Sequence, residues 1–198
     1  MKATHSLRLL LCIALSHISA TTLASSSGFT LHHTVINPAC LALINGSLSD
    51  RPFITSIDLD RCQTANATFA GQGKGVAYQR QDGSQYQYRV IGQTKTGLFV
   101  IATTLRSSGS GVFQNVVVIR LKQQQRHTWD STTRSFASTP YTSLTYVANL
   151  GGGDRFSGAY QQLSVVGNHL IGRKANNNNP ANQATHPQQR IDIDLSAL

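Results

Sequence analysis

Regular alternation of apolar and polar residues, interrupted by short turn motifs, is the feature that most constrains the fold of this chain from Lys74 onward. An alternating segment from Val76 to Gln81 is followed by Asp82-Gly83, and the alternation resumes from Ser84 to Ile91. Asp-Gly between two such segments is a strong local signal for a β-hairpin, because both central residues of its tight turn take positive φ. We therefore expect two antiparallel strands joined at Asp82-Gly83.

The faces of these predicted strands differ in character. On the second strand, alternation places Tyr86 and Tyr88 on one face and Gln87 and Arg89 on the other. One face is therefore aromatic and apolar, and the other is polar and basic. This division is typical of a sheet that buries one side and exposes the other to water.

Two continuous apolar segments further along the chain predict strands in the interior. Leu98–Ala102 and Val116–Ile119 are short and are bounded by turn residues, as expected for buried central strands. Tyr141–Leu150 also has strand character, and Gly151–Asp154 is expected to form a turn. Gly167-Asn168 then predicts a second tight hairpin.

Helical signals are few. Asn37-Pro38 predicts the start of a short helix that ends near Ile44. The sequence contains no Glu, which is a good helix former, and this argues against long helices. Lys122–Pro140, rich in Gln, Ser and Thr, has only weak strand character. We therefore expect an all-β fold, an antiparallel sandwich or a partly closed barrel, with at most one short N-terminal helix.

The first 24 residues have the layout of a secretory signal peptide. Lys2 and Arg8 accompany a short apolar run that ends at Leu15, and Ala24 closes a small-residue cleavage motif. The run is far shorter than the roughly 20 residues that span a bilayer, so we favour cleavage over a retained membrane anchor. We expect a periplasmic or secreted protein with one β-rich domain over 25–198 and a mobile, Asn-rich loop at about 174–189.

The cysteines are consistent with an oxidising compartment. Cys12 lies in the predicted signal peptide, which leaves Cys40 and Cys62 as an even pair. We predict that these two form a disulfide, the alternative being two buried free thiols. Their spacing contains no Cys-x-x-Cys pair and therefore does not indicate a zinc site.

The charge balance favours an acidic partner. The formal net charge is +9, and it becomes +7 without Lys2 and Arg8. Such a basic balance suits an acidic protein or an anionic component of the cell envelope. No dense run of basic residues is present, which argues against a dedicated nucleic-acid patch.

One resemblance follows from the turn residues. Ser108-Gly-Ser-Gly111, the apolar strand after it and Gly153-Asp154-Arg155 resemble small exported bacterial domains of unknown function, over about residues 85–172. Because those domains have no assigned role, the resemblance transfers no functional residue to this chain.

The Asp154-Arg155 pair has two interpretations, and the more specific one is a basic recognition surface. Three glycines before Asp154-Arg155 allow a turn that presents Arg155 outward, so that Arg155, Arg80 and Arg89 form one binding surface. The simpler interpretation is a turn stabilised by Asp154, with Arg155 paired locally.

Residues for catalysis or metal binding are less evident. Asp58 and Asp60, and likewise Asp192 and Asp194, are two residues apart and share a strand face, as paired carboxylates of a hydrolase would. The wet face of an edge strand explains them equally. His32-His33 on a strand would point to opposite faces, so no metal site and no cofactor are predicted.

These observations favour an exported binding protein of the bacterial envelope, an inhibitor, an immunity-type partner or an accessory factor, over an enzyme. It would recognise its acidic partner through the basic sheet face. The alternatives are a hydrolase acting on an envelope polymer, and a protein that adheres to anionic lipid or polysaccharide by charge alone.

Overall fold

The computed structural model describes residues 29–44, 54–63, 69–72, 75–154, 158–174 and 189–198. The predicted signal peptide, Arg155 and most of the predicted mobile loop lie outside these residues. The elements are, in order, β1 (Thr30–Leu31), β2 (Thr34–Val35), α1 (Pro38–Ile44), β3 (Ser56–Asp58), α2 (Leu59–Gln63), β4 (Phe69–Gln72), β5 (Gly75–Gln79), β6 (Gln85–Gln93), β7 (Phe99–Arg106), β8 (Val112–Asp130), β9 (Ser135–Asp154), β10 (Tyr160–Val166), β11 (His169–Lys174) and β12 (Gln189–Asp194).

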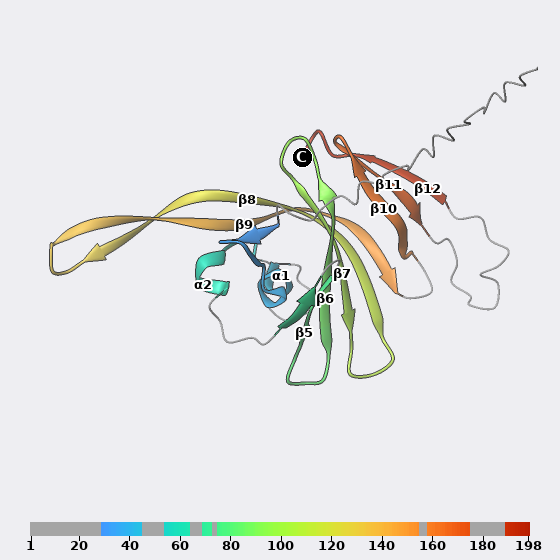
Figure 1. Ribbon diagram of the computed structural model, residues 1–198, viewed down its shortest axis with the longest axis horizontal. Coiled ribbons are helices and arrows are strands. Elements are labelled where there is room, and N and C mark those ends of the chain that lie inside the picture. Colours follow the sequence, from blue (N-terminus) through green and yellow to red (C-terminus); the bar gives the residue numbers. More distant parts are fainter. Residues whose placement is uncertain (1–28, 45–53, 64–68, 73–74, 155–157, 175–188) are drawn as a thin grey trace, which may run out of the picture.

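The expected all-β fold is confirmed. A seven-stranded antiparallel sheet in the order β3-β9-β8-β7-β6-β5-β4 forms the body of the molecule, and it is strongly curled (Figure 1). A smaller sheet in the order β10-β11-β12 packs at one end. The strands β8 and β9 are much longer than the others and extend as a twisted two-stranded arm beyond the rest of the fold.

The main sheet is buried on both faces at its centre. One face carries Tyr86, Tyr88 and Ile101 into a core closed by the N-terminal segment. The other face carries Val100 and Val118 into a second core closed by the small sheet. This explains the continuous apolar runs, since a strand covered on both sides needs apolar residues at successive positions. Each fully buried side chain contributes roughly 1.5–3 kcal/mol.

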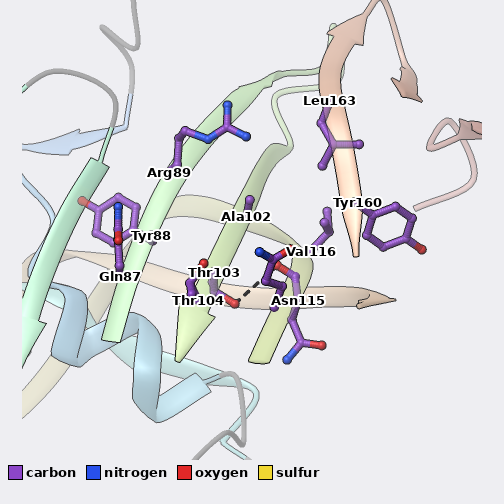
Figure 2. A pocket seen from close by; sticks show the side chains of 11 residues that line it. Gln87, Tyr88, Arg89, Ala102, Thr103, Thr104, Asn115, Val116, Tyr160 and Leu163 are labelled. Carbon is purple, nitrogen blue, oxygen red and sulfur yellow. Dashed lines mark hydrogen bonds between the residues drawn. The ribbon is translucent and has the colours of Figure 1, made fainter. Parts of the chain in front are cut away.

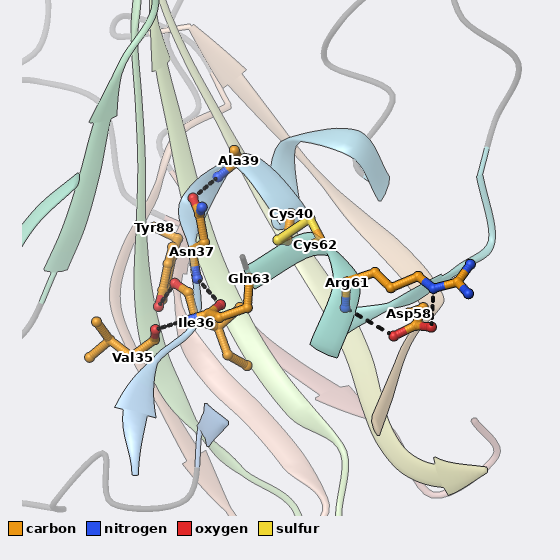
Figure 3. Close-up of a disulfide and its surroundings, with 10 residues drawn as sticks. All are labelled: Val35, Ile36, Asn37, Ala39, Cys40, Asp58, Arg61, Cys62, Gln63 and Tyr88. Carbon is orange, nitrogen blue, oxygen red and sulfur yellow. Dashed lines mark hydrogen bonds and ion pairs between the residues drawn. A yellow bond between two sulfur atoms is a disulfide. The ribbon is translucent and has the colours of Figure 1, made fainter. Parts of the chain in front are cut away.

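The N-terminal segment that closes the first core, which includes α1 and α2 and which we call the N-terminal cover, is held by a disulfide (Figure 3). The helix α1 begins where expected, with the Asn37 side chain accepting a hydrogen bond of 2.9 Å from the Ala39 N–H. The predicted Cys40–Cys62 disulfide is confirmed, and it joins α1 to α2 with 5.9 Å between the two Cα atoms. The Tyr88 hydroxyl, from the sheet, donates a 2.7 Å hydrogen bond to the Ile36 carbonyl oxygen.

The expectation of at most one short helix was too low, because α2 is a second one. Asp58 ends β3, and its carboxylate accepts a 3.2 Å hydrogen bond from the Arg61 N–H, which satisfies a free donor of the first turn. Leu59 is fully buried, and Cys62 is tied to α1. A five-residue helix has little intrinsic stability, so its contacts with the rest of the fold hold it.

The first hairpin has the expected place but another turn. The strands β5 and β6 pair in the register Gln79–Gln85, which leaves a loop longer than two residues. Gly83 has a φ of 80°, and Asp82 does not take a positive φ. The Asp82 carboxylate instead accepts hydrogen bonds from the N–H and the hydroxyl of Ser84, at 2.9 and 2.6 Å. This is the arrangement of a three-residue loop with a left-handed glycine.

Two segments with little or no predicted strand character belong to β8 and β9. The predicted turn at Gly151–Asp154 is wrong, because the strand continues to Asp154 through an irregularity opposite Asn115 and Val117. Gly151 has a φ of 85°, and a Cβ on Gly152 would overlap the Gln114 carbonyl. The glycines therefore permit a bulge at a close approach of two backbones. Of Lys122–Pro140, all but the four-residue tip is strand.

In the part of the chain that the structure describes, none of the helices has the length and apolar character needed to cross a membrane.

Candidate functional site

A cleft of about 210 Å³ lies between the polar face of the main sheet and β10 (Figure 2). Its floor is formed by successive strands of that sheet, where Gln87 is opposite Thr104 and Thr104 is opposite Gln114. Tyr160 and Leu163 of β10 form its wall. The polar floor and the wall come from segments at least 44 positions apart in the sequence, so only the tertiary structure creates the cleft.

Arg89 is the cationic residue of this cleft. It lies opposite Ala102 in the ladder, and it points away from the core that buries its neighbour Tyr88, as the alternation predicts. Figure 2 shows its guanidinium extending toward the Leu163 side of the cleft. Arg89 is exposed, and its guanidinium has no carboxylate partner among the described residues.

A second cation lies beside the wall. The Lys174 ammonium is 5.6 Å from the centroid of the Tyr160 ring, which is within range of a cation–π contact. The Tyr160 hydroxyl donates a 2.6 Å hydrogen bond to the Leu150 carbonyl oxygen, which fixes the ring. Partial burial raises the pKa of Tyr160, so its hydroxyl keeps its proton at neutral pH.

The other predicted surface residues do not gather at Arg89. Arg80 is at the β5–β6 turn, where it lies 3.5 Å from the Asp82 carboxylate. Four ladder pairs separate it from Arg89, a distance of about 16 Å along the strand. Asp154 ends β9 opposite Phe113, one position from the Gly153–Gln114 pair at the cleft. Arg155 lies outside the described residues, so its part in a shared surface stays a prediction.

Asp58 and Asp60 hold the base of the arm. The Asp58 carboxylate is 2.6 Å from the Arg126 guanidinium of β8 and 3.7 Å from that of Arg61 (Figure 3 shows the latter pair). The Asp60 carboxylate accepts a 2.7 Å hydrogen bond from the Thr142 N–H of β9. Its other oxygen is 2.8 Å from the His32 ring. The two carboxylates therefore attach the N-terminal cover to the arm.

The pKa of Asp60 reflects these contacts. Burial acts to raise the pKa, but the Thr142 and His32 hydrogen bonds and the charge of Arg126 outweigh it, so the pKa lies below its usual 3.8. A carboxyl with a lowered pKa stays ionised at neutral pH and is a poor general acid.

Asp192 and Asp194 have the exposed-edge role. Both are exposed on β12, whereas Ile191 and Ile193, which alternate with them, are partly buried. Asp192 lies 2.8 Å from the His169 ring, and Asp194 accepts hydrogen bonds from Ser196.

The adjacent histidines form a turn rather than part of a strand. His32 and His33 have φ values of 48° and 65° and connect β1 to β2, where the Thr34 hydroxyl donates a 2.7 Å hydrogen bond to the Leu31 carbonyl. The predicted placement on opposite strand faces is therefore wrong, because two left-handed residues reverse the chain there. Within the described ranges, no group of three or more His, Cys or Asp side chains could hold a metal ion.

The arm is a functional candidate that the sequence did not reveal. Among the residues that the structure describes, β8 and β9 pair only with each other beyond Ile119 and Ser143, as far as residues 130 and 135. Trp129 and Phe136 face each other near the tip, with 54% and 69% of their surfaces exposed and 5.2 Å between ring centroids. In the sequence, Trp129 and Phe136 are isolated aromatic residues in segments rich in polar residues, and neither predicts a strand by itself. The two rings meet only because β8 and β9 pair.

The two faces of the arm differ in charge. The odd-numbered residues 123–129 of β8 and the even-numbered residues 136–142 of β9 lie on one face, which we call the neutral face. Contacts across the strands confirm this, including those from Gln123 to Thr142 and from Ser138 to His127. The opposite face carries Arg126, whose guanidinium lies 5.3 Å from the Tyr141 ring centroid.

Comparison of the chain with protein-family models, with curated proteins and with solved structures finds no match. The resemblance to exported bacterial domains therefore stays a prediction.

Proposed function

We propose that this protein is an exported, non-enzymatic binding protein of the cell envelope that recognises an acidic partner through the cleft at Arg89. The observation that carries the proposal is an exposed guanidinium with no carboxylate partner among the described residues, above a polar floor. Arginine binds carboxylates and phosphates through two parallel hydrogen bonds, which suits a cation held ready for an acidic group.

The dimensions of the cleft support a small anionic group as the part recognised. A cleft of about 210 Å³ accommodates a carboxylate side chain or a chain terminus rather than a large ligand. Gln87 and Gln114 supply amide groups on the floor of the same cleft, and Lys174 adds positive charge at the wall. The excess of basic residues over the whole chain would steer such a partner toward it.

A hydrolase receives no comparable support from the carboxylates. Asp58 and Asp60 are engaged with groups at the base of the arm, and Asp192 and Asp194 lie on an exposed edge strand. A glycosidase needs two carboxyl groups that flank one substrate bond, with one of them held protonated. The lowered pKa values of Asp60 and Asp194 oppose that requirement.

The test is recovery of a partner from an envelope extract with the immobilised mature protein, followed by titration of that partner. We expect Arg89→Ala to weaken binding by about 10- to 150-fold, the equivalent of one hydrogen-bonded charge pair. Arg190→Ala is the matched control, because it also removes one exposed arginine but from the edge strand β12.

The remaining outcomes separate the alternatives. Arg80→Ala should leave affinity unchanged if the cleft alone is the site, and should weaken it if the surface includes the β5–β6 turn. Loss of all binding at physiological salt, where charges are screened over about 8 Å, would indicate adhesion by charge alone. Equal affinities of Arg89→Ala and wild type would refute the proposed site.

A further inference from the structure

The neutral face of the arm is an exposed surface of aromatic rings and hydrogen-bonding groups. The odd-numbered residues 123–129 and the even-numbered residues 136–142 that form it include no Asp, Lys or Arg, whereas Asp130 and Arg134 lie at the tip between the two strands. All of its residues except Thr142 are exposed. Gln125, His127 and Ser138 supply amide, imidazole and hydroxyl groups along it, and Trp129 and Phe136 supply rings at its outer end.

The Trp129–Phe136 pair has two properties that need an explanation, the contact between the rings and their exposure to water. An edge-to-face contact across a ladder stabilises a two-stranded ribbon, and it accounts for the 5.2 Å centroid separation. It does not account for the exposure, because more than half of each side chain remains in contact with water. Exposed aromatic rings next to polar groups are typical of a surface that binds another molecule.

The neutral face continues into a cavity at the base of the arm. This cavity, of about 240 Å³, is lined by Lys122, Gln123 and Thr142 of the arm. Leu31 of β1 and His32 of the turn after it also line the cavity. Six residues separate Gln123 from Trp129, which corresponds to about 20 Å along a strand. The face is therefore an extended track with a cavity at one end and two rings at the other.

The chemistry of the track selects its occupant. Anionic lipid and nucleic acid require cations along the surface that they contact. Arg126 lies on the opposite face, and Lys122 and Arg134 lie at the two ends of the track rather than along it. A second copy of the chain that contacted the two rings alone would cover roughly 300 Å² per copy, which is about half of a minimal stable interface.

An uncharged sugar chain matches the remaining properties. One face of a pyranose ring presents C–H groups, which contact the electron-rich face of an aromatic ring, and its hydroxyl groups pair with planar amides such as Gln125. We propose that the neutral face of the arm binds an uncharged polysaccharide of pyranose units, which lies along the arm and stacks on Trp129 or Phe136. This binding is independent of the cleft at Arg89.

The chain provides its own reporter for the test. Trp129 is the single tryptophan of the sequence, so intrinsic fluorescence reports on the tip of the arm without interference. The mature protein is titrated with cellohexaose, maltohexaose and chitohexaose. We expect at least one of them to produce a saturable change in Trp129 emission, because a stacked sugar displaces water from the indole.

Variants then assign the binding to one face. Phe136→Leu keeps an apolar contact with Trp129 and removes the flat ring, and Gln125→Ala removes an amide from the track. We expect each to weaken binding about tenfold. Thr128→Ala, on the opposite face of β8, is the control and should bind as wild type does. Circular dichroism checks that each variant retains its strand content.

Three results would overturn the inference. The first is no saturable emission change with any of the three oligosaccharides at millimolar concentration. The second is an emission change with vesicles of 3:1 phosphatidylcholine and phosphatidylglycerol but with no sugar, which would identify a membrane surface. The third is an emission change that depends on protein concentration alone, with a dimer in sedimentation, which would identify a second copy. Arg89→Ala should leave sugar binding unchanged, so failure of this site and failure of the cleft are distinguishable.

Discussion

Opening the Cys40–Cys62 disulfide should destabilise the protein by an amount that its loop length sets. The two cysteines are 22 positions apart, and chain-entropy arguments give about 3 kcal/mol for a closed loop of that size. The segment between them includes most of α1 and of α2, which pack on one face of the main sheet, and the edge strand β3 of that sheet. The short helices have little stability of their own, so the loss should be close to the full value.

Reduction of the wild-type protein is the cleaner perturbation. Cys40 is fully buried, so Cys40→Ala and Cys62→Ala together would remove packing as well as the covalent link. Reduction keeps both sulfur atoms and removes only the link. Urea unfolding of the oxidised and reduced proteins, followed by circular dichroism, gives the two free energies of unfolding.

The expected result is a lower urea midpoint for the reduced protein, with a difference of about 3 kcal/mol in the free energy of unfolding. The double Cys→Ala variant should lose more, because the sulfur atoms of the buried Cys40 and the partly buried Cys62 are also missing. Equal midpoints for the oxidised and reduced proteins would refute the reasoning. Such a result would mean that the N-terminal cover is held by its packing and hydrogen bonds alone.

Two further predictions concern export and acid stability. Mass spectrometry of the native protein should find an N-terminus at Ser25 and no alkylatable thiol, whereas an intact Met1 with both Cys40 and Cys62 alkylatable would refute export. For acid stability, the lowered pKa of Asp60 means that its contribution is fully present above its usual value of 3.8 and is lost as pH falls through the native value. In urea unfolding, Asp60→Asn should therefore be less stable than wild type at pH 6 by about 0.5–1 kcal/mol, and equal to it near pH 2. A difference in stability that persists at pH 2 would exclude ionisation of Asp60 as the cause.

The floor of the candidate cleft was predictable from the sequence, but its wall was not. Alternation correctly placed Gln87 and Arg89 on the face opposite Tyr86 and Tyr88, because side chains of a strand alternate wherever the strand lies. The wall formed by Tyr160 was not predictable, since it depends on how the small sheet packs against the main one. Arg80 lies about 16 Å from Arg89 along the strand, and a shared binding surface of the two stays a prediction.

The sequence by itself determined the features that depend on near neighbours along the chain. The Asn37 cap, the hairpin at Gly83, the apolar runs of the central strands and the cysteine pair all follow from local chemistry or from the count of available residues. Local sequence also set the alternation that divides each strand into two faces.

Only the tertiary structure decided the arm and the two covers of the sheet. Lys122–Pro140 has no apolar alternation because no other layer packs on it, so its strands are specified by pairing with each other and by the contacts of Asp58 and Asp60 at its base. A bulge at Gly152 likewise depends on the backbone of the opposite strand. Pairing between distant segments is stabilised only once both are in place, and therefore it leaves little signal in either segment alone.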